Sequence, residues 1–355
     1  MKFHTSSIRK AWLKVLKDLL SFTIKKFDRK KGSSVIPAPG TIKKLLVIRI
    51  DRIGDMILST PVFESFVKSI KEGEVSVLAN KYNKAVLKGS PYIKTIYSNG
   101  FKDIKQIRKA GYDACLVLTF DFSLKSALLC YLSGARYKIG FKDRGTDAFY
   151  NVEIEKDSLP KYEVYRNLEL LEKSGIEALY RKPLLFPGIT EEVEARKYFA
   201  GCGITASDLV IGLHPGSKRK PRRWPEERFV ELSRLLEKKA AREGKTIKFI
   251  ITEGPGEKGL AFRVKELIGE NAFVLPPSEI NIWAAVFKRF SLFVCGDTGP
   301  IHIAMAMDIP AAGIYGTSDY VRWSPPDNPK LAVIKGRKCK DISAEEVMES
   351  IGTLL

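Results

Sequence analysis

Short apolar runs alternate along this chain with segments in which apolar positions recur every three or four residues. The runs are typical of strands buried in a parallel sheet, and the periodic segments are typical of helices that cover it. We predict strands that begin at Lys44, Val75, Thr95, Ala114 and Tyr137 in the first half, and at Leu209, Lys248, Ala272, Ser291 and Ala311 in the second. Residues 142–161 are predicted to form a charge-rich loop. Such alternation predicts an open α/β sheet in each half.

A short linker is predicted to divide the two halves. PLLFPG, residues 183–188, is the candidate boundary, because the strand–helix alternation restarts one helix later. We expect an N-terminal extension at 1–40, a Rossmann-like domain at 41–186, a second at 187–340, and a final helix at 341–355 that is a candidate to return to the first domain. Two such domains are expected to face a central cleft at the carboxyl ends of both sheets.

The N-terminal segment is both basic and amphipathic. Residues 1–31 hold ten Lys or Arg against two Asp, a large share of the net charge of +19. Lys10, Lys14 and Lys17 are interleaved with apolar positions at helical spacing, which is typical of a helix on an anionic membrane surface. A helix packed on the following domain, with a solvated basic face, is the alternative. The charge predicts an anionic partner: nucleic acid, acidic lipid or a phosphorylated substrate.

Several classes of protein are disfavoured by what the sequence lacks. Its five cysteines are scattered and odd in number, which argues against a disulfide framework or a zinc site and favours a reducing compartment. No apolar run reaches the roughly 18 residues that span a bilayer, and we expect no signal peptide. The Walker-type phosphate loop, the nucleophile elbow and a DxD carboxylate pair are all missing, so we expect neither a metal nor a cofactor.

The first segment with candidate chemistry is RIDRIGDMILSTP, residues 49–61. It follows a predicted strand, and Asp55 lies at or near the start of the next helix. An ionised carboxylate at the C-terminal edge of a sheet is placed to act as a general base toward a hydroxyl. An ordinary N-terminal helix cap is the alternative. Arg52 is a candidate contact for an acceptor or a membrane, as are the basic residues of the N-terminal segment.

The second segment is LHPGSKRKPRRWP, residues 213–225. Ser217 lies in a small turn whose donors are free to bind a ligand. Lys218 and Arg222 belong to a run of five cations in six residues that precedes a helix. Guanidinium and ammonium groups suit the oxygens of a diphosphate, so we favour a diphosphate site here. A solvated charged surface is the alternative.

The third segment, GDTGPIHIAMA, forms a tight turn that opens a helix. Asp297, Thr298 and Gly299 make the turn, and His302 follows within the helix. Free N–H groups at such a helix start suit an anion, whereas a turn that serves only the fold is the alternative. Glu257, in a GPGE turn after another strand, is a candidate contact for ribose or base, or a simple helix cap.

Together these motifs resemble glycosyltransferase family 9, whose best-known members are the ADP-heptose:lipopolysaccharide heptosyltransferases. The resemblance covers roughly residues 44–326, with one departure, the Arg222-Arg223 pair where the family often carries a pair that contains Lys. It implies a GT-B fold, metal-independent transfer with inversion at the anomeric carbon, and Asp55 as catalytic base. The donor-binding residues that we predict are Ser217, Lys218, Arg222, Glu257, Asp297, Thr298, Gly299 and His302.

We therefore expect an inverting glycosyltransferase that binds a nucleotide-sugar donor and a phosphorylated glycolipid acceptor. The resemblance makes heptose from ADP-heptose the expected donor and the lipopolysaccharide inner core the expected acceptor. The enzyme is expected in the cytoplasm, in peripheral contact with the anionic inner membrane, without a nucleic-acid partner. Three alternatives stay open: a family-9-type transferase with another donor, a relative that binds donor without transferring it, and a non-catalytic basic protein that binds nucleic acid or other anions.

Overall fold

The computed structural model divides the 355-residue chain into two compact units, Met1–Arg181 and Lys182–Leu355. The predicted boundary was placed a few residues later, at 186/187. The N-terminal helix with Lys10, Lys14 and Lys17 falls outside the described residues and stays a prediction. The structure describes residues 18–19, 22–24, 37–38, 40–257 and 259–355.

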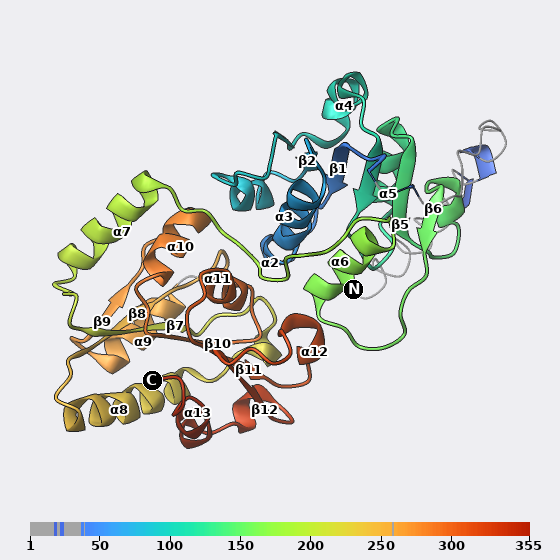
Figure 1. The fold of residues 1–355 in the computed structure, drawn as a ribbon. Helices are drawn as coiled ribbons and strands as arrows, with labels where there is room; N and C mark the ends of the chain where they lie inside the picture. Colours follow the sequence, from blue (N-terminus) through green and yellow to red (C-terminus); the bar gives the residue numbers. More distant parts are fainter. Residues whose placement is uncertain (1–17, 20–21, 25–36, 39, 258) are drawn as a thin grey trace. The chain divides into compact units, whose positions relative to one another are not determined.

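The first unit is built on a six-stranded sheet (Figure 1). Every neighbouring pair of strands is parallel, and the spatial order is β3-β2-β1-β4-β5-β6. The strands are β1 Lys44–Ile48, β2 Glu74–Leu78, β3 Thr95–Tyr97, β4 Ala114–Val117, β5 Tyr137–Phe141 and β6 Val152–Ile154. The α-helices are α2 Ile53–Ile57, α3 Thr60–Ser69, α4 Ile104–Ala110, α5 Leu124–Leu132 and α6 Glu163–Glu172, and the 3-10 turns are η1 Asn83–Leu87, η2 Gly100–Asp103 and η3 Thr146–Ala148.

The apolar runs form strands here because both faces of the sheet are covered. All four residues of β4, and all of β1 after Lys44, are buried, which is the pattern of a strand with helices on each side. The strand order reverses between β1 and β4. In doubly wound sheets ligands bind at such a switch point, beyond the carboxyl ends of the strands.

The predicted loop over residues 142–161 contains a strand instead. β6 pairs with β5 in parallel, with Ile139 opposite Val152. Val152 and Ile154 are buried and Glu153 between them is partly exposed. A three-residue edge strand among charged residues is too short to produce a clear alternation in the sequence, so only its pairing reveals it.

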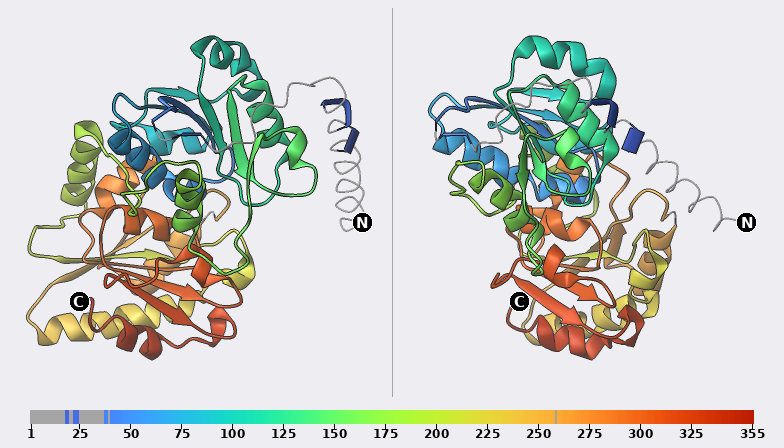
Figure 2. Two further views of the ribbon diagram at one scale, coloured as in Figure 1. Left: turned by 45° about the vertical axis from the view of Figure 1, so that its right-hand side comes forward. Right: turned by 90° about the vertical axis from the view of Figure 1, so that its right-hand side faces the viewer.

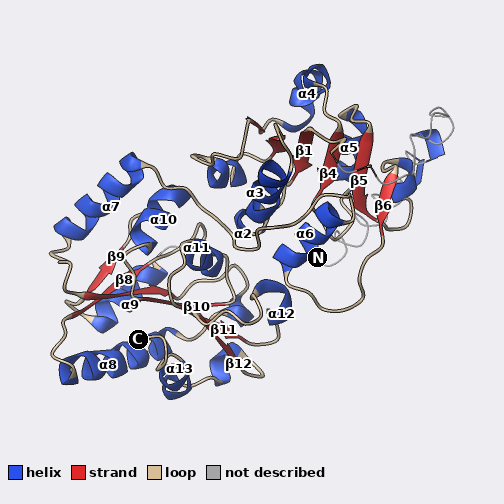
Figure 3. Cartoon of the chain, in the orientation of Figure 1, coloured by secondary structure: helices blue, strands red, loops and turns tan. Residues whose placement is uncertain are grey.

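The second unit repeats this plan, as Figure 3 shows by secondary structure. Its parallel sheet has the order β12-β11-β10-β7-β8-β9, which is the order of the first unit read from the opposite edge. The strands are β7 Leu209–His214, β8 Ile247–Ile251, β9 Ala272–Val274, β10 Leu292–Gly296, β11 Ala311–Tyr315 and β12 Leu331–Lys335. The helices are α7 Ile189–Gly201, α8 Glu226–Arg242, α9 Leu260–Ile268, α10 Ile280–Phe287, α11 Pro300–Ala306, α12 Tyr320–Trp323 and α13 Ala344–Ser350, with 3-10 turns η4 Lys220–Arg222 and η5 Cys339–Asp341. The switch point of this sheet lies between β7 and β10.

The C-terminal helix α13 belongs to the second unit, so the expectation that it returns to the first domain is wrong. α13 packs against α8 and β12, and the two helices lie side by side in Figures 1 and 2. Val347 and Ile351 are fully buried and join the apolar core that contains Leu236 of α8. Their i, i+4 spacing places both side chains on one apolar face, and that face packs against α8.

Candidate active site

Arg49, the residue that follows β1 by one position, gathers three carboxylates in the first unit. Its side chain is buried, and its Nε lies 3.1 Å from Oδ1 of Asp51. Its Nη2 lies 3.4 Å from Oδ1 of Asp55 and 3.1 Å from Oε1 of Glu163. Its Nη1 donates to the carbonyl oxygen of Leu118, just beyond β4. One guanidinium therefore ties together the ends of β1 and β4, the start of α2 and the start of α6.

The loop between β1 and α2 is held by side-chain amides. Asn83 donates to the carbonyl oxygen of Arg49 at 3.0 Å, and Asn80 donates to that of Asp51 at 2.6 Å. Asp55 lies in the first turn of α2, and 13% of its side chain is exposed. The predicted base is thus fixed in place and still reaches solvent.

Burial shapes the charges in this cluster. It raises the pKa of Asp51 to about 6, because the loss of water and the charge of Asp55 outweigh the opposing charge of Arg49. For Arg49, burial alone would lower the pKa, but the charges of Asp51, Glu163 and Asp55 raise it above its usual value. Arg49 is consequently a fixed cation, and Asp51 changes its charge near pH 6.

A basic and aromatic group not predicted from the sequence lies beyond β4. The Arg166 guanidinium lies 3.9 Å from the centre of the Phe120 ring, and the Lys156 ammonium lies 5.0 Å from it. Arg166 also pairs with Glu163 at 3.1 Å. Arg52 is exposed at the N-cap of α2. Arg52 and the partly exposed Lys156 suit an anionic acceptor, whereas Arg166 is buried.

In the second unit, Glu257 lies under the turn that follows β7. Its Oε2 accepts from the N–H of Gly254 at 2.7 Å and lies 3.4 Å from Nε2 of His214, whose Nδ1 is 2.9 Å from Oγ1 of Thr252. Burial alone would raise the pKa of Glu257, but the bond and charge of His214 and the Gly254 N–H lower it overall. A Cβ on Gly216 would lie 1.9 Å from Oε2. The Glu257 carboxylate therefore lies against Gly216 and supports the turn that follows β7.

The segments after β7 and β10 meet at the switch point. Arg222 Nη1 lies 2.6 Å from Oδ2 of Asp297, and the Ser217 hydroxyl donates to the carbonyl oxygen of Asp297 at 3.4 Å. Arg223 donates through Nε to the carbonyl oxygen of Ser217 at 2.8 Å. The two segments approach each other so closely that a Cβ on Gly296 would lie 2.6 Å from the carbonyl oxygen of Arg222. Arg222 and Asp297 were both predicted as donor-binding residues, but their pairing with each other was not.

The remaining predicted donor residues differ in exposure. Lys218 and Gly299 are exposed and Thr298 is partly exposed. His302 is buried within α11, with its ring centre 6.2 Å from that of Trp323. Lys218, Thr298 and Gly299 are therefore accessible to a ligand, whereas the His302 side chain is buried.

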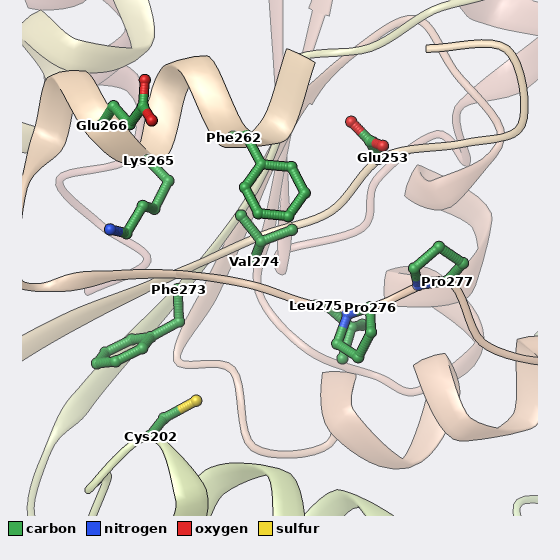
Figure 4. A pocket seen from close by; sticks show the side chains of 10 residues that line it. All are labelled: Cys202, Glu253, Phe262, Lys265, Glu266, Phe273, Val274, Leu275, Pro276 and Pro277. Atoms are coloured by element: carbon green, nitrogen blue, oxygen red, sulfur yellow. The ribbon is translucent and has the colours of Figure 1, made fainter. Parts of the chain in front are cut away.

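A cavity of about 390 Å³ lies beyond the ends of β8 and β9. Figure 4 shows Phe262 and Val274 near its middle, with Cys202 at one end. Glu253 lines it and directly precedes the turn that holds Glu257. None of the predicted site residues lines this cavity.

In the part of the chain that the structure describes, no helix combines the length and the apolar character required to cross a bilayer. Within the same residues, no group of three or more His, Cys, Asp or Glu side chains is placed to hold a metal ion.

This chain is similar in sequence to known glycosyltransferases. The pattern of glycosyltransferase family 9 (heptosyltransferase) matches residues 101–351. A putative glycosyltransferase of Haemophilus influenzae is 22% identical over 305 residues, which is 80% of this chain and 86% of that protein. Lipopolysaccharide heptosyltransferase 3 of Escherichia coli is 25% identical over 303 residues, covering 78% of this chain and 84% of that protein.

Solved structures share the fold. A family 9 glycosyl transferase from Veillonella parvula has a TM-score of 0.79 at 20% identity, covering 88% of this chain and 97% of that one. The E. coli ADP-heptose lps heptosyltransferase II has a TM-score of 0.74 at 20% identity, covering 88% and 98%. The fold class is that of the GT-B heptosyltransferases, with two Rossmann-like units, as predicted. The match to more than half of the chain places this protein in glycosyltransferase family 9, the heptosyltransferase family, and it is a glycosyltransferase.

Proposed function

We propose that this protein is an inverting, metal-independent transferase that moves heptose from ADP-heptose to the inner core of a lipopolysaccharide acceptor. The supporting observation is the meeting of Ser217, Arg222 and Asp297 at the switch point of the second sheet. The names of similar proteins support this substrate class: they include lipopolysaccharide heptosyltransferases and an E. coli heptosyltransferase solved with ADP-2-deoxy-2-fluoro heptose.

The second unit would bind the diphosphate of the donor. The Ser217 hydroxyl, the Lys218 ammonium and the free N–H groups around Thr298 would donate to phosphate oxygens. Arg222 is paired with Asp297 at 2.6 Å, so a bound diphosphate would compete with that carboxylate for the guanidinium. Fixed donors of this kind stabilise the charge that develops on a leaving group, which is a large contribution to catalysis.

The first unit would supply the base. Asp55 would take the proton from an acceptor hydroxyl, and the oxygen would attack the anomeric carbon of heptose from the face opposite the diphosphate. The new C–O bond forms as the bond to the diphosphate breaks, and the electron pair leaves with ADP. Attack from the opposite face accounts for inversion, and no covalent enzyme intermediate is needed.

The donor assignment is tested by measuring the thermal stability of the purified protein with ADP, UDP, GDP or CMP, with and without EDTA. A ligand that binds only the folded state raises the melting temperature. We expect ADP alone to do so, and we expect EDTA to leave the effect unchanged. A shift with UDP or GDP would keep the transferase and replace the donor. No shift with any nucleotide would favour the non-catalytic anion-binding alternative.

The base assignment is tested by Asp55→Asn, which removes the charge and nearly conserves the shape. General base catalysis contributes about 10²–10⁴-fold, so transfer from ADP-heptose to a heptose-deficient lipopolysaccharide should fall by that order. The affinity for ADP should be unchanged, because the proposed diphosphate site consists of residues of the second unit. Asp147→Asn is the matched control, since Asp147 is an exposed aspartate in the first turn of η3. Turnover that survives Asp55→Asn would rule out Asp55 as the base.

A further inference from the structure

We propose that Glu163 is a positioning residue that acts on Asp55 through the guanidinium of Arg49. This inference rests on the proposed function, in which Asp55 is the base. Glu163 begins α6, lies 114 positions from Arg49 in the chain and belongs to none of the motifs that define the candidate site.

The geometry at one nitrogen carries the inference. Nη2 of Arg49 donates to Oδ1 of Asp55 at 3.4 Å and to Oε1 of Glu163 at 3.1 Å. An Nη2 group has two hydrogens, so these two carboxylates occupy both. Nη1 donates to the carbonyl oxygen of Leu118 on the other side. Glu163 and Leu118 therefore fix the plane of the guanidinium, and with it the direction of the N–H that points at Asp55.

Glu163 is itself held firmly. Its side chain is 1% exposed, and its second oxygen, Oε2, lies 3.1 Å from Nη1 of Arg166. Arg166 in turn stacks 3.9 Å from the centre of the Phe120 ring. A buried carboxylate is costly unless each oxygen has a partner, and both oxygens of Glu163 have an arginine. A continuous chain of contacts therefore runs from Phe120 through Arg166, Glu163 and Arg49 to Asp55.

Glu163 and Asp55 share Nη2 of Arg49, and Asp51 lies 3.1 Å from Nε of the same guanidinium. Without the Glu163 carboxylate, the guanidinium would lose one of the contacts that fix its orientation. Asp55 would then lose a defined position relative to Arg49.

The test compares Glu163→Gln and Glu163→Asp with Glu169→Gln in the full-length enzyme. Glu169 is the matched control, because it lies on the same helix and pairs with Lys161 and Lys173 but does not contact Arg49. We expect Glu163→Gln to lower kcat by about tenfold or more, since a small misplacement of a catalytic group is costly. KM for ADP-heptose and the affinity for ADP should be unchanged. Glu169→Gln should match the wild type in all three measurements.

Glu163→Asp keeps the charge but shortens the side chain. We expect it to recover part of kcat at an unchanged KM for ADP-heptose, which a purely structural role would not produce. If Glu163→Gln does not fold, the inference is tested by Glu163→Asp alone. A folded Glu163→Asp variant with wild-type kcat would then overturn the inference. A folded Glu163→Gln with wild-type kcat also overturns it. In that case, loss of turnover in Asp55→Asn would still support Asp55 as the base. Turnover retained by Asp55→Asn overturns both proposals.

Discussion

At the scale of single residues, Gly216 and Glu257 share a space that leaves no room for a methyl group. The ideal Cβ position on Gly216 is 1.9 Å from Oε2 of Glu257. Gly216→Ala must therefore push the carboxylate away from the N–H of Gly254 and from His214. We expect the variant to lose about 1–3 kcal/mol of unfolding free energy, the usual cost of overpacking, and to bind ADP more weakly.

The measurements for Gly216→Ala are urea unfolding and calorimetric titration with ADP. Gly201→Ala is the control, because a Cβ on Gly201 meets no atom within 4 Å. Equal stability and equal ADP affinity in both variants would show that the Glu257 brace is not needed for the turn.

Asp51 gives a second prediction at this scale, on the pH dependence of stability. Its pKa is about 6 in the folded protein against an ordinary value of 3.8, so between these values the folded state holds a proton that the unfolded state has lost. Wild-type stability is therefore reduced as pH rises through that window. Asp51→Asn removes the effect, and its melting temperature relative to wild type should rise from acid to neutral pH.

Asp208→Asn is a control of opposite sign for this prediction. The N–H and hydroxyl of Thr205 lower the pKa of Asp208, so its carboxylate stabilises the fold above its unfolded pKa and loses that effect as pH falls through the folded pKa. The variant should lose melting temperature relative to wild type toward neutral pH. A pH-independent difference for Asp51→Asn would contradict the pKa assigned to that residue.

At the scale of elements, α13 shows how a terminal helix is assigned to a unit. Its apolar face, Val347 and Ile351, is fully buried in the core that includes α8. Ile351→Ala should cost about 2–5 kcal/mol of unfolding free energy, as buried Ile→Ala changes do. Urea unfolding measures this, and hydrogen exchange should increase in α8. Glu349→Ala, on the exposed side of the same helix, should leave both unchanged. An equal effect of the two substitutions would argue against this packing.

At the scale of the whole molecule, the two units share a strand order but differ in the charges that follow equivalent strands. After β1, the carboxylates Asp51 and Asp55 alternate with Arg49 and Arg52, whereas residues 218–223 after β7 include five cations and no acidic residue. A general base requires a carboxylate, and a diphosphate site requires cations. The shared plan therefore suits a transferase in which one unit activates the acceptor and the other holds the donor.

The charge of the chain leads to a prediction about membranes. We propose that residues 1–31, with a net charge of +8, hold the enzyme on the anionic inner leaflet. Each basic residue near such a surface is worth about 1 kcal/mol, so replacing Lys10, Lys14 and Lys17 with Gln should weaken binding to phosphatidylglycerol vesicles about a hundredfold. Vesicle co-sedimentation measures this, with phosphatidylcholine vesicles as the control. Unchanged binding by the triple variant would argue against the membrane role.

The sequence by itself determined the local structure and the motif residues. The strands at Lys44 and Leu209 were predictable, because a run of apolar residues is a local property of the sequence. Asp55 and Ser217 were singled out because each follows a strand. Their places after β1 and β7 are those predicted, while their roles stay predictions.

Only the tertiary structure decided the partners of these residues. Glu163 is far from Arg49 in the chain, and Asp297 is far from Arg222, yet each pair is in contact. The parallel order of the strands brings β4 beside β1 and β10 beside β7, and no local pattern encodes that order. Hydrophobic periodicity specifies which residues are buried, whereas the pairing of buried charges depends on which strands and helices become neighbours.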